Sequence, residues 1–228
     1  MGDDLVAQVC AAAVAVVHVD GAAVSMMVSP TVRDALHATD RVSGELEEWQ
    51  LAFGEGPCVD AFAGGGPVLV ADLSSDGCSA RWPAFTPAAL GSGARAVFTL
   101  PLQVGAIRLG VLDLYRTRPG RLIPQELADA LGFADTAALV LVDGAAGTDH
   151  ATAGLGWQRD DPATHQAEVH QATGMVLAQL GTSAESAFAR LRAHAYARDR
   201  QLREVAREVV DRRLRFEPDP PPDDHDQE

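Results

Sequence analysis

Lysine is absent from this chain of 228 residues, and all 18 of its basic side chains are arginines. A lysine amine is required by nucleotide phosphate loops, pyridoxal Schiff bases, the strand lysine of kinases and phosphorylatable receiver domains. The sequence excludes all four. No Ser/His/Asp arrangement and no pair of acid–base carboxylates is tied together by spacing. We therefore expect no catalytic residues and no enzyme, and we identify no cofactor.

Cysteine is also scarce. The three cysteines, Cys10, Cys58 and Cys78, are odd in number and contain no CxxC pair. This excludes a disulfide framework and a four-cysteine zinc site, so we expect reduced thiols. We expect no metal site made of histidines either, because His165 and His170 point about 140° apart around a helix.

Long apolar runs are missing as well. None reaches the roughly 18 residues that a membrane-spanning helix requires. The first residues, MGDDLVAQVC, carry acids where a secretory signal would carry basic residues. We therefore expect a cytoplasmic protein without a membrane partner.

The formal net charge of −14 is unevenly distributed. Residues 1–162 have a net charge of −11, residues 163–216 of +3 and residues 217–228 of −6. This asymmetry is typical of a small module for polyanions attached to an acidic domain. We expect the acidic tail, residues 217–228, to be disordered and solvating. The alternative is that this tail competes with RNA for the arginines.

Strand and helix patterns alternate through residues 1–143, the expected first domain. Apolar runs bounded by turn residues predict strands at 22–28, 35–40 and 67–73, and a long hairpin over 95–116 that turns at 104–106. Helical spacing predicts helices at 43–53, from Pro57, within 80–91 and at 124–143. These elements predict an α+β domain, with helices packed against an antiparallel sheet.

Residues 144–161 are rich in Gly, Ala, Thr and Asp without a sustained period, which predicts a linker. After it, residues 162–216 predict a bundle of three helices. Asp161 is expected to cap the first, Thr182 and Glu185 to form a capping box for the second, and Asp199 to cap the third. Apolar stripes at helical spacing give the expected core: Val169, Ala172, Val176, Leu180, Ala187, Phe188, Leu191, Ala195, Leu202, Val205, Ala206, Val209 and Leu214.

Seven arginines fall within residues 197–216, ARDRQLREVAREVVDRRLRF. They are compatible with a solvated helix face, in which Glu204 pairs with Arg207 and Glu208 with Arg212. They are equally compatible with nucleic-acid binding. Composition alone does not decide between these interpretations.

The full pattern of residues 165–216 closely resembles the ANTAR domain, an RNA-binding module of three helices from transcription antitermination regulators. The resemblance rests on residues spread over all three expected helices: Ala172, Gly174, Leu180, Gly181, Ala187, Phe188, Leu191, Arg192, Leu202, Val205 and Ala206. It implies binding to paired RNA hairpins with short loops, in nascent transcripts.

Five residues are our candidates for RNA contact: Gln171, Thr173, Gly174, Arg192 and Arg198. Guanidinium groups bind phosphates bidentately, and unpaired loop bases expose edges to side chains. Gly174 leaves room for a close backbone approach, although tight helix packing explains it equally well. Thr173 stands where the family often has lysine.

Residues 1–143 resemble a GAF domain through the stretches GEGPCVDAF, PVLVADL, RWPAF and LPLQVGAIRLGVLDLYR. The resemblance implies an antiparallel sheet with a ligand pocket on one side and helices on the other. It also implies a sensory role, an unidentified small-molecule ligand and a homodimer. The lysine-containing signature of cyclic-nucleotide binders is missing.

Several residues near GEGPC have two interpretations each. Cys58 follows Pro57 at an expected helix start, where the helix dipole would favour a sensor thiolate, but a buried apolar role is the alternative. Glu55 is expected to cap the same helix, and Trp82 to anchor the domain core. For the whole chain, the alternative to RNA binding is a protein-interaction adaptor whose helical bundle binds a protein partner.

Overall fold

The computed structural model describes residues 2–29, 32–147, 162–198 and 200–217. The chain divides into two compact units, Met1–Thr164 and His165–Glu228. In the first unit the elements are α1 (Gly2–Val17), β1 (Gly21–Ser29), β2 (Val32–Ala38), α2 (Arg41–Phe53), α3 (Pro57–Gly64), β3 (Val68–Val70), α4 (Asp76–Arg81), α5 (Phe85–Ser92), β4 (Ala96–Val104), β5 (Ile107–Arg116) and α6 (Pro124–Gly147). α7 (Pro162–Leu180), α8 (Ala184–Ala197) and α9 (Leu202–Val210) follow.

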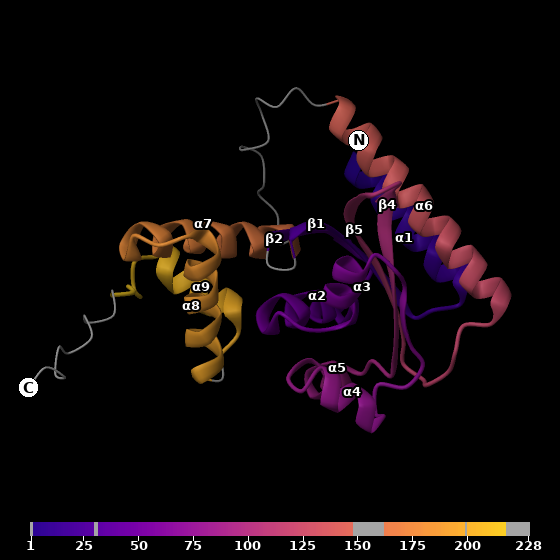
Figure 1. The fold of residues 1–228 in the computed structure, drawn as a ribbon, viewed down its shortest axis with the longest axis horizontal. Coiled ribbons are helices and arrows are strands. Elements are labelled where there is room, and N and C mark those ends of the chain that lie inside the picture. Colours follow the sequence, from indigo (N-terminus) through magenta and orange to yellow (C-terminus); the bar gives the residue numbers. More distant parts are fainter. Residues whose placement is uncertain (1, 30–31, 148–161, 199, 218–228) are drawn as a thin grey trace, which may run out of the picture. The chain divides into compact units, whose positions relative to one another are not determined.

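A five-stranded antiparallel sheet of order β2-β1-β5-β4-β3 forms the centre of the first unit (Figure 1). The hairpin of β4 and β5 is confirmed. Its arms pair from Ala96 with Arg116 to Val104 with Ile107, and Gly105 adopts a left-handed φ of 59° at the turn. Glycine suits this turn because a side chain would strain that conformation.

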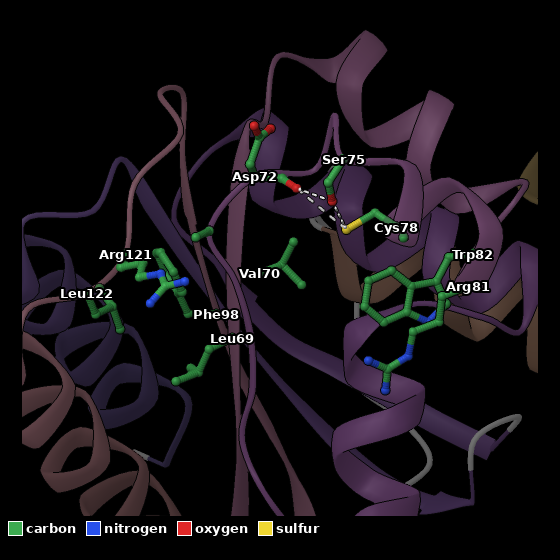
Figure 2. Close-up of a pocket in the computed structure, with 12 residues that line it drawn as sticks. Leu69, Val70, Asp72, Ser75, Cys78, Arg81, Trp82, Phe98, Arg121 and Leu122 are labelled. Carbon is green, nitrogen blue, oxygen red and sulfur yellow. Dashed lines mark hydrogen bonds between the residues drawn. The ribbon is translucent and has the colours of Figure 1, made fainter.

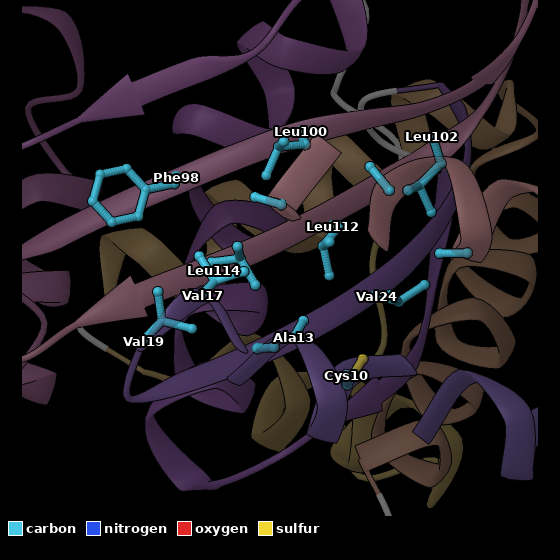
Figure 3. Packing of buried hydrophobic residues seen from close by; sticks show 14 of the residues in the cluster. Cys10, Ala13, Val17, Val19, Val24, Phe98, Leu100, Leu102, Leu112 and Leu114 are labelled. Atoms are coloured by element: carbon cyan, nitrogen blue, oxygen red, sulfur yellow. The ribbon is translucent and has the colours of Figure 1, made fainter. Parts of the chain in front are cut away.

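Two helices, α1 and α6, cover one face of this sheet, and their apolar residues form a continuous core with β1, β4 and β5 (Figure 3). The patterns above assign no element to residues 2–17, although Val6, Cys10, Ala13 and Val17 are buried at spacings of four, three and four. That spacing is the inward stripe of a helix. α6 continues to Gly147, so residues 144–147 are helical where a linker was expected.

The opposite face is covered by α2 to α5. Helices therefore cover both faces of the sheet. Asp40 begins α2 through a capping box with Ser43, so Asp40 is not part of a strand. The expected strand at 67–73 was wrong in extent: β3 spans only Val68–Val70, at the edge of the sheet. The chain then turns, and Leu73 is buried beside α4 and α5.

The second unit consists of α7, α8 and α9. The expected core is confirmed except at Leu180 and Leu214, which are half-buried. The second helix is capped by Ser183, which accepts a hydrogen bond from Ser186 N, and not by Thr182. The third helix is shorter than expected, because it ends at Val210. The caps expected at Asp161 and Asp199 lie outside the described residues, as do residues 148–161 and 218–228.

Within the described residues, no helix is long and apolar enough to cross a membrane.

Candidate functional site

The five candidate RNA contacts differ in how far they reach the surface. Gln171 and Gly174 are exposed and share one face of α7, since they are three residues apart. Arg198 is exposed at the C-terminal end of α8. Thr173 is half-buried, and its hydroxyl donates to the Val169 carbonyl at 2.7 Å. Thr173 is therefore turned toward its own helix backbone.

Gly174 had two explanations, and the structure favours one of them. A Cβ built at this position would meet no described atom within 4 Å. Tight helix packing in this unit therefore does not require the glycine. Since glycine in a helix interior costs about 1 kcal/mol relative to alanine, the residue lowers helix stability without a packing benefit. The surface at Gly174 is open and is compatible with a close approach from outside the chain.

Arg192 is half-buried on α8, and its guanidinium lies over the Phe188 ring, 5.8 Å from the centroid. A cation held over an aromatic face has a restricted orientation. One turn later, Tyr196 projects from the same helix and is 71% exposed. The family pattern did not point to Tyr196. Its signal in the sequence was a lone aromatic at a position outside the apolar stripe.

The arginines of the last helix pair differently from the expectation. Arg200 binds Glu208 with both terminal nitrogens, at 2.8 and 3.0 Å. Arg207 binds Glu168 of α7 at 3.3 and 3.2 Å. Two-point contacts of this kind across the unit are better oriented than neighbouring pairs along one helix. These two arginines therefore stabilise the bundle.

Three arginines lack such partners. Among the described residues, Arg198, Arg212 and Arg215 form no ion pair with a side chain. Arg212 has a left-handed φ of 61° in the turn after α9. Charge for a polyanion is thus available at the end of α8 and after α9.

A buried polar network lies in the first unit, where α2 and α3 pack on the sheet. Gln50 is its centre: Gln50 Oε1 accepts from Cys58 N at 2.7 Å, and Nε2 donates to Asp113 Oδ2 at 3.1 Å. The hydroxyl of Thr99 donates to the other oxygen of Asp113, and the hydroxyl of Ser25 donates to Glu47. All of these polar residues are buried. Spacing in the sequence gave no sign of the network.

Arg33 supplies the positive charge of the network. Its Nη1 donates to Cys58 Sγ at 2.6 Å and lies 4.0 Å from Glu47 Oε2. Burial lowers the pKa of Arg33, but Cys58, Glu47 and Asp113 raise it more, so the guanidinium stays charged. Its Nε has no hydrogen-bond partner. The charge is therefore compensated by its surroundings, while the hydrogen bonding is incomplete.

Burial also shifts the pKa values of the acidic groups in this network. It raises the pKa of Asp113 well above its ordinary value, and the neighbouring Glu47 raises it further. Burial likewise raises the pKa of the Cys58 thiol, although Arg33 opposes the shift. This direction is opposite to that expected from a helix N-terminus, because desolvation outweighs the dipole. Burial thus favours the neutral thiol, against the Arg33 guanidinium that donates to its sulfur.

An open groove of about 680 Å³ lies along the outer edge of β3. Residues of both sheet faces line it: Phe98, Arg121 and Leu122 on one side of β3, and Cys78, Arg81 and Trp82 on the other (Figure 2). Among the described residues, the Arg121 guanidinium binds no other side chain. The groove could hold a small ligand that combines apolar and anionic groups.

Residues around the groove are fixed by hydrogen bonds. Trp82 is buried, as expected, and its Nε1 donates to Asp60 Oδ2 at 3.1 Å. Arg81 donates to the same oxygen at 2.7 Å. Glu55 was expected to cap α3, but its carboxylate accepts from Ala84 N and Phe85 N, at 2.7 and 2.8 Å, and so caps α5. The wall beside Trp82 is therefore rigidly supported.

Comparisons with known proteins identify both units. A family model for the GAF domain matches residues 3–142, and one for the ANTAR domain matches residues 162–210. No curated protein matches the chain. Two similar solved structures share the fold. One is a GAF domain from Synechocystis sp. in its photoproduct state, with 13% identity and a TM-score of 0.51, covering 64% of this chain and 96% of that one. The other is the GAF domain of a phosphoenolpyruvate-protein phosphotransferase from Coxiella burnetii, with 15% identity and a TM-score of 0.50, covering 64% and 84%.

Proposed function

Because this chain belongs to the GAF domain family and carries an ANTAR domain, we propose that it is a signal-responsive transcription antitermination regulator. In this proposal the ANTAR domain binds paired RNA hairpins in nascent transcripts, and the GAF domain controls that binding. The observation that carries the proposal is the ANTAR match over α7, α8 and α9 together with the arginines that its ion pairs leave available.

RNA recognition by this unit divides into two kinds of contact. Arg198, Arg212 and Arg215 supply attraction to phosphates, which is independent of sequence and sensitive to salt. The exposed face of α7 with Gln171 and Gly174, and Arg192 on α8, supply contacts to the loop. Thr173 contributes less, since its hydroxyl is already bonded to the helix backbone.

The homodimer is proposed from the outer faces of α1 and α6. These two helices pack side by side, and each exposes large apolar side chains: Leu5 and Val16 on α1, and Leu131, Leu139 and Val142 on α6. Two copies that join these faces would form a four-helix bundle and cover the apolar residues. Such a dimer presents two ANTAR domains to two hairpins.

The sensory role is proposed for the GAF domain. The network under α2 and α3 is filled by its own side chains, whereas the groove at β3 is open. We therefore place a small ligand in the groove, with Arg121 as its anion contact. Because the proposed targets are nascent transcripts, we place the protein in the cytoplasm.

Crosslinking of the chain to cellular RNA, followed by sequencing, tests the function. Wild type should enrich transcripts with paired hairpins, and Arg198→Ala should reduce the enrichment. Arg118→Ala is the matched control, because it removes an exposed arginine from the GAF domain. Recovery of the same background RNA with all three proteins would refute RNA binding. Salt-insensitive association with a protein would then support the alternative, an interaction adaptor.

A further inference from the structure

The chain turns back on the ANTAR domain after α9. Arg213 N donates to the Glu208 carbonyl at 2.8 Å, and Arg212 has a left-handed φ of 61°. Arg212 N donates to the Val209 carbonyl at 3.0 Å. These bonds form a Schellman motif, which ends a helix and redirects the chain. Glycine is usual at the left-handed position, because another side chain costs about 1–2 kcal/mol there. The contacts that follow must offset this cost.

Phe216 fixes the redirected chain at two points. Its amide donates to Gln179 Oε1 of α7 at 2.8 Å. Its ring packs on the His194 imidazole of α8, with ring centroids 5.1 Å apart and an angle of 59° between the planes. Phe216 is half-buried by these contacts. The acidic tail, residues 217–228, therefore starts from a defined place beside α7 and α8.

Positive charge without an acidic partner lies next to this place. Arg198 follows His194 by four residues, which is about one helical turn. Burial lowers the pKa of the His194 imidazole, and the charge of Arg198 lowers it further. Arg212 and Arg215 belong to the redirected segment itself. In the part of the chain that the structure describes, none of these three arginines forms an ion pair with a side chain.

The sequence of the acidic tail is opposite in charge to these arginines. Residues 217–228 read EPDPPPDDHDQE, with six acids, no base and four prolines. A proline-rich segment extends by about 3.1 Å per residue, so these residues can reach about 37 Å from Phe216. The longest helix of the bundle, α7, has 19 residues and is about 28 Å long. The acids can therefore reach all three arginines from their anchor.

We propose that residues 217–228 compete with RNA for Arg198, Arg212 and Arg215, so that the ANTAR domain carries its own inhibitor. This inference rests on the proposed RNA-binding function. Carboxylates and phosphates both bind guanidinium groups, so the two exclude each other at one arginine. A tethered segment acts at an effective concentration in the millimolar range, so weak contacts suffice. A tail that covers the arginines for nine-tenths of the time lowers RNA affinity about tenfold.

The first test measures RNA affinity with the full chain. The probe is an RNA of two tandem stem-loops, selected from randomised loops for binding to the wild type. A variant in which the six acids of the tail are replaced by their amides keeps the length and the prolines. It should bind the probe about tenfold more tightly than the wild type at low salt. The difference should shrink at high salt, because the competing contacts are electrostatic.

A matched pair of variants separates the tail from net charge. Asp223→Asn combined with Asp224→Asn should raise affinity about twofold, since it removes two of the six competing charges. Asp4→Asn combined with Asp76→Asn removes the same charge from exposed positions of the GAF domain and should leave affinity unchanged. Equal gains in the two double variants would assign the effect to net charge and overturn the inference.

The second test detects the tail on the arginines without RNA. Phenylglyoxal modifies accessible arginines, and mass spectrometry of the peptides measures each rate. At low salt Arg198, Arg212 and Arg215 should react several times faster in the variant with six amides than in the wild type. Arg118, which is exposed on the GAF domain, should react equally in both.

Equal rates at the three arginines in both proteins would overturn the inference and leave RNA binding intact. Failure to select any RNA would instead refute the proposed function. The modification rates would then still decide whether the tail covers the arginines.

Discussion

Gln50 and Asp113 are joined inside the GAF domain by a hydrogen bond of 3.1 Å, which links α2 to β5. Gln50 also accepts from the amide of Cys58, in the first turn of α3. One buried amide side chain therefore joins two helices and the central sheet. A buried polar group with each of its partners in place defines a unique packing, and its loss leaves those partners unsatisfied.

Replacement of Gln50 by leucine tests this role. Gln50→Leu keeps the volume but leaves the Cys58 amide and an Asp113 oxygen unpaired, so we expect the free energy of unfolding to fall by about 2–3 kcal/mol. Urea denaturation measures the change. The matched control is Gln103→Leu at an exposed position of β4, which should change stability by less than about 0.5 kcal/mol. An equally small effect at Gln50 would show that the network is dispensable.

Asp113 gives the stability of the GAF domain a pH dependence. Its pKa is raised in the folded chain by burial and by Glu47, so the native state binds a proton more tightly than the unfolded state. The contribution of Asp113 to stability is then fully present below the ordinary carboxyl pKa of about 4 and is lost as the pH rises toward and through the folded-state pKa. Asp113→Asn should remove part of this fall.

Urea unfolding at intervals from pH 4 to 8 measures that difference. The wild type should lose stability with rising pH more steeply than Asp113→Asn. Asp76→Asn removes an exposed carboxylate from α4 and should keep the wild-type slope. Parallel curves for wild type and Asp113→Asn would contradict the assignment.

The cysteines should react slowly in the native protein. Burial raises the pKa of Cys10 to about 12, with Glu47 adding to it, and burial raises that of Cys58 as well. Since the thiolate is the reactive form, labelling with a thiol reagent at pH 7 should require unfolding at both positions. Mass spectrometry of the labelled peptides measures each rate. Fast native labelling of Cys58 beside slow labelling of Cys10 would support a sensor thiol instead.

The proposed dimer depends on the outer face of α6, where Leu139 is 64% exposed. Leu139→Glu places a charge in the apolar face, so we expect the mass measured by light scattering to fall from that of a dimer to that of a monomer. Ile107→Glu makes the same change at an exposed position of the hairpin and should leave the dimer intact. A wild-type chain that is already monomeric at micromolar concentration would exclude the interface.

Features that repeat along one segment of the chain could be predicted from the sequence. Sites assembled from residues of several segments could not. The hairpin of β4 and β5 and the core stripes of α7, α8 and α9 are local patterns, so each was identified from spacing alone. The polar network is different, since Ser25, Arg33, Gln50 and Asp113 come from four separate elements. Each is a single polar residue in an apolar or mixed segment. Only the fold brings them together.

The ion pairs of the ANTAR domain also could not be predicted from local spacing alone. Spacing along one helix suggested that Glu208 pairs with Arg212, but Arg200 binds Glu208 with two nitrogens from the turn before α9. The helix ends at Val210, so Arg212 no longer lies one turn beyond Glu208. A pairing rule for regular helices fails where the helix stops. The end of α9 therefore decides which arginines pair within the domain and which stay available for RNA.

Gly174 separates stability from function. Because a Cβ at this exposed position of α7 meets no described atom, Gly174→Ala should stabilise the ANTAR domain by about 0.4–1 kcal/mol. The same methyl group would obstruct a close approach of RNA to the helix, so we expect affinity to fall severalfold for an RNA of two tandem stem-loops that was selected for binding to the wild type. Thermal unfolding and a binding titration on the same sample measure both effects. Gly91→Ala, at an exposed glycine of α5 with the same open surroundings, is the matched control and should leave RNA binding unchanged. A stabilised Gly174→Ala protein with undiminished affinity would show that RNA does not approach this face of α7.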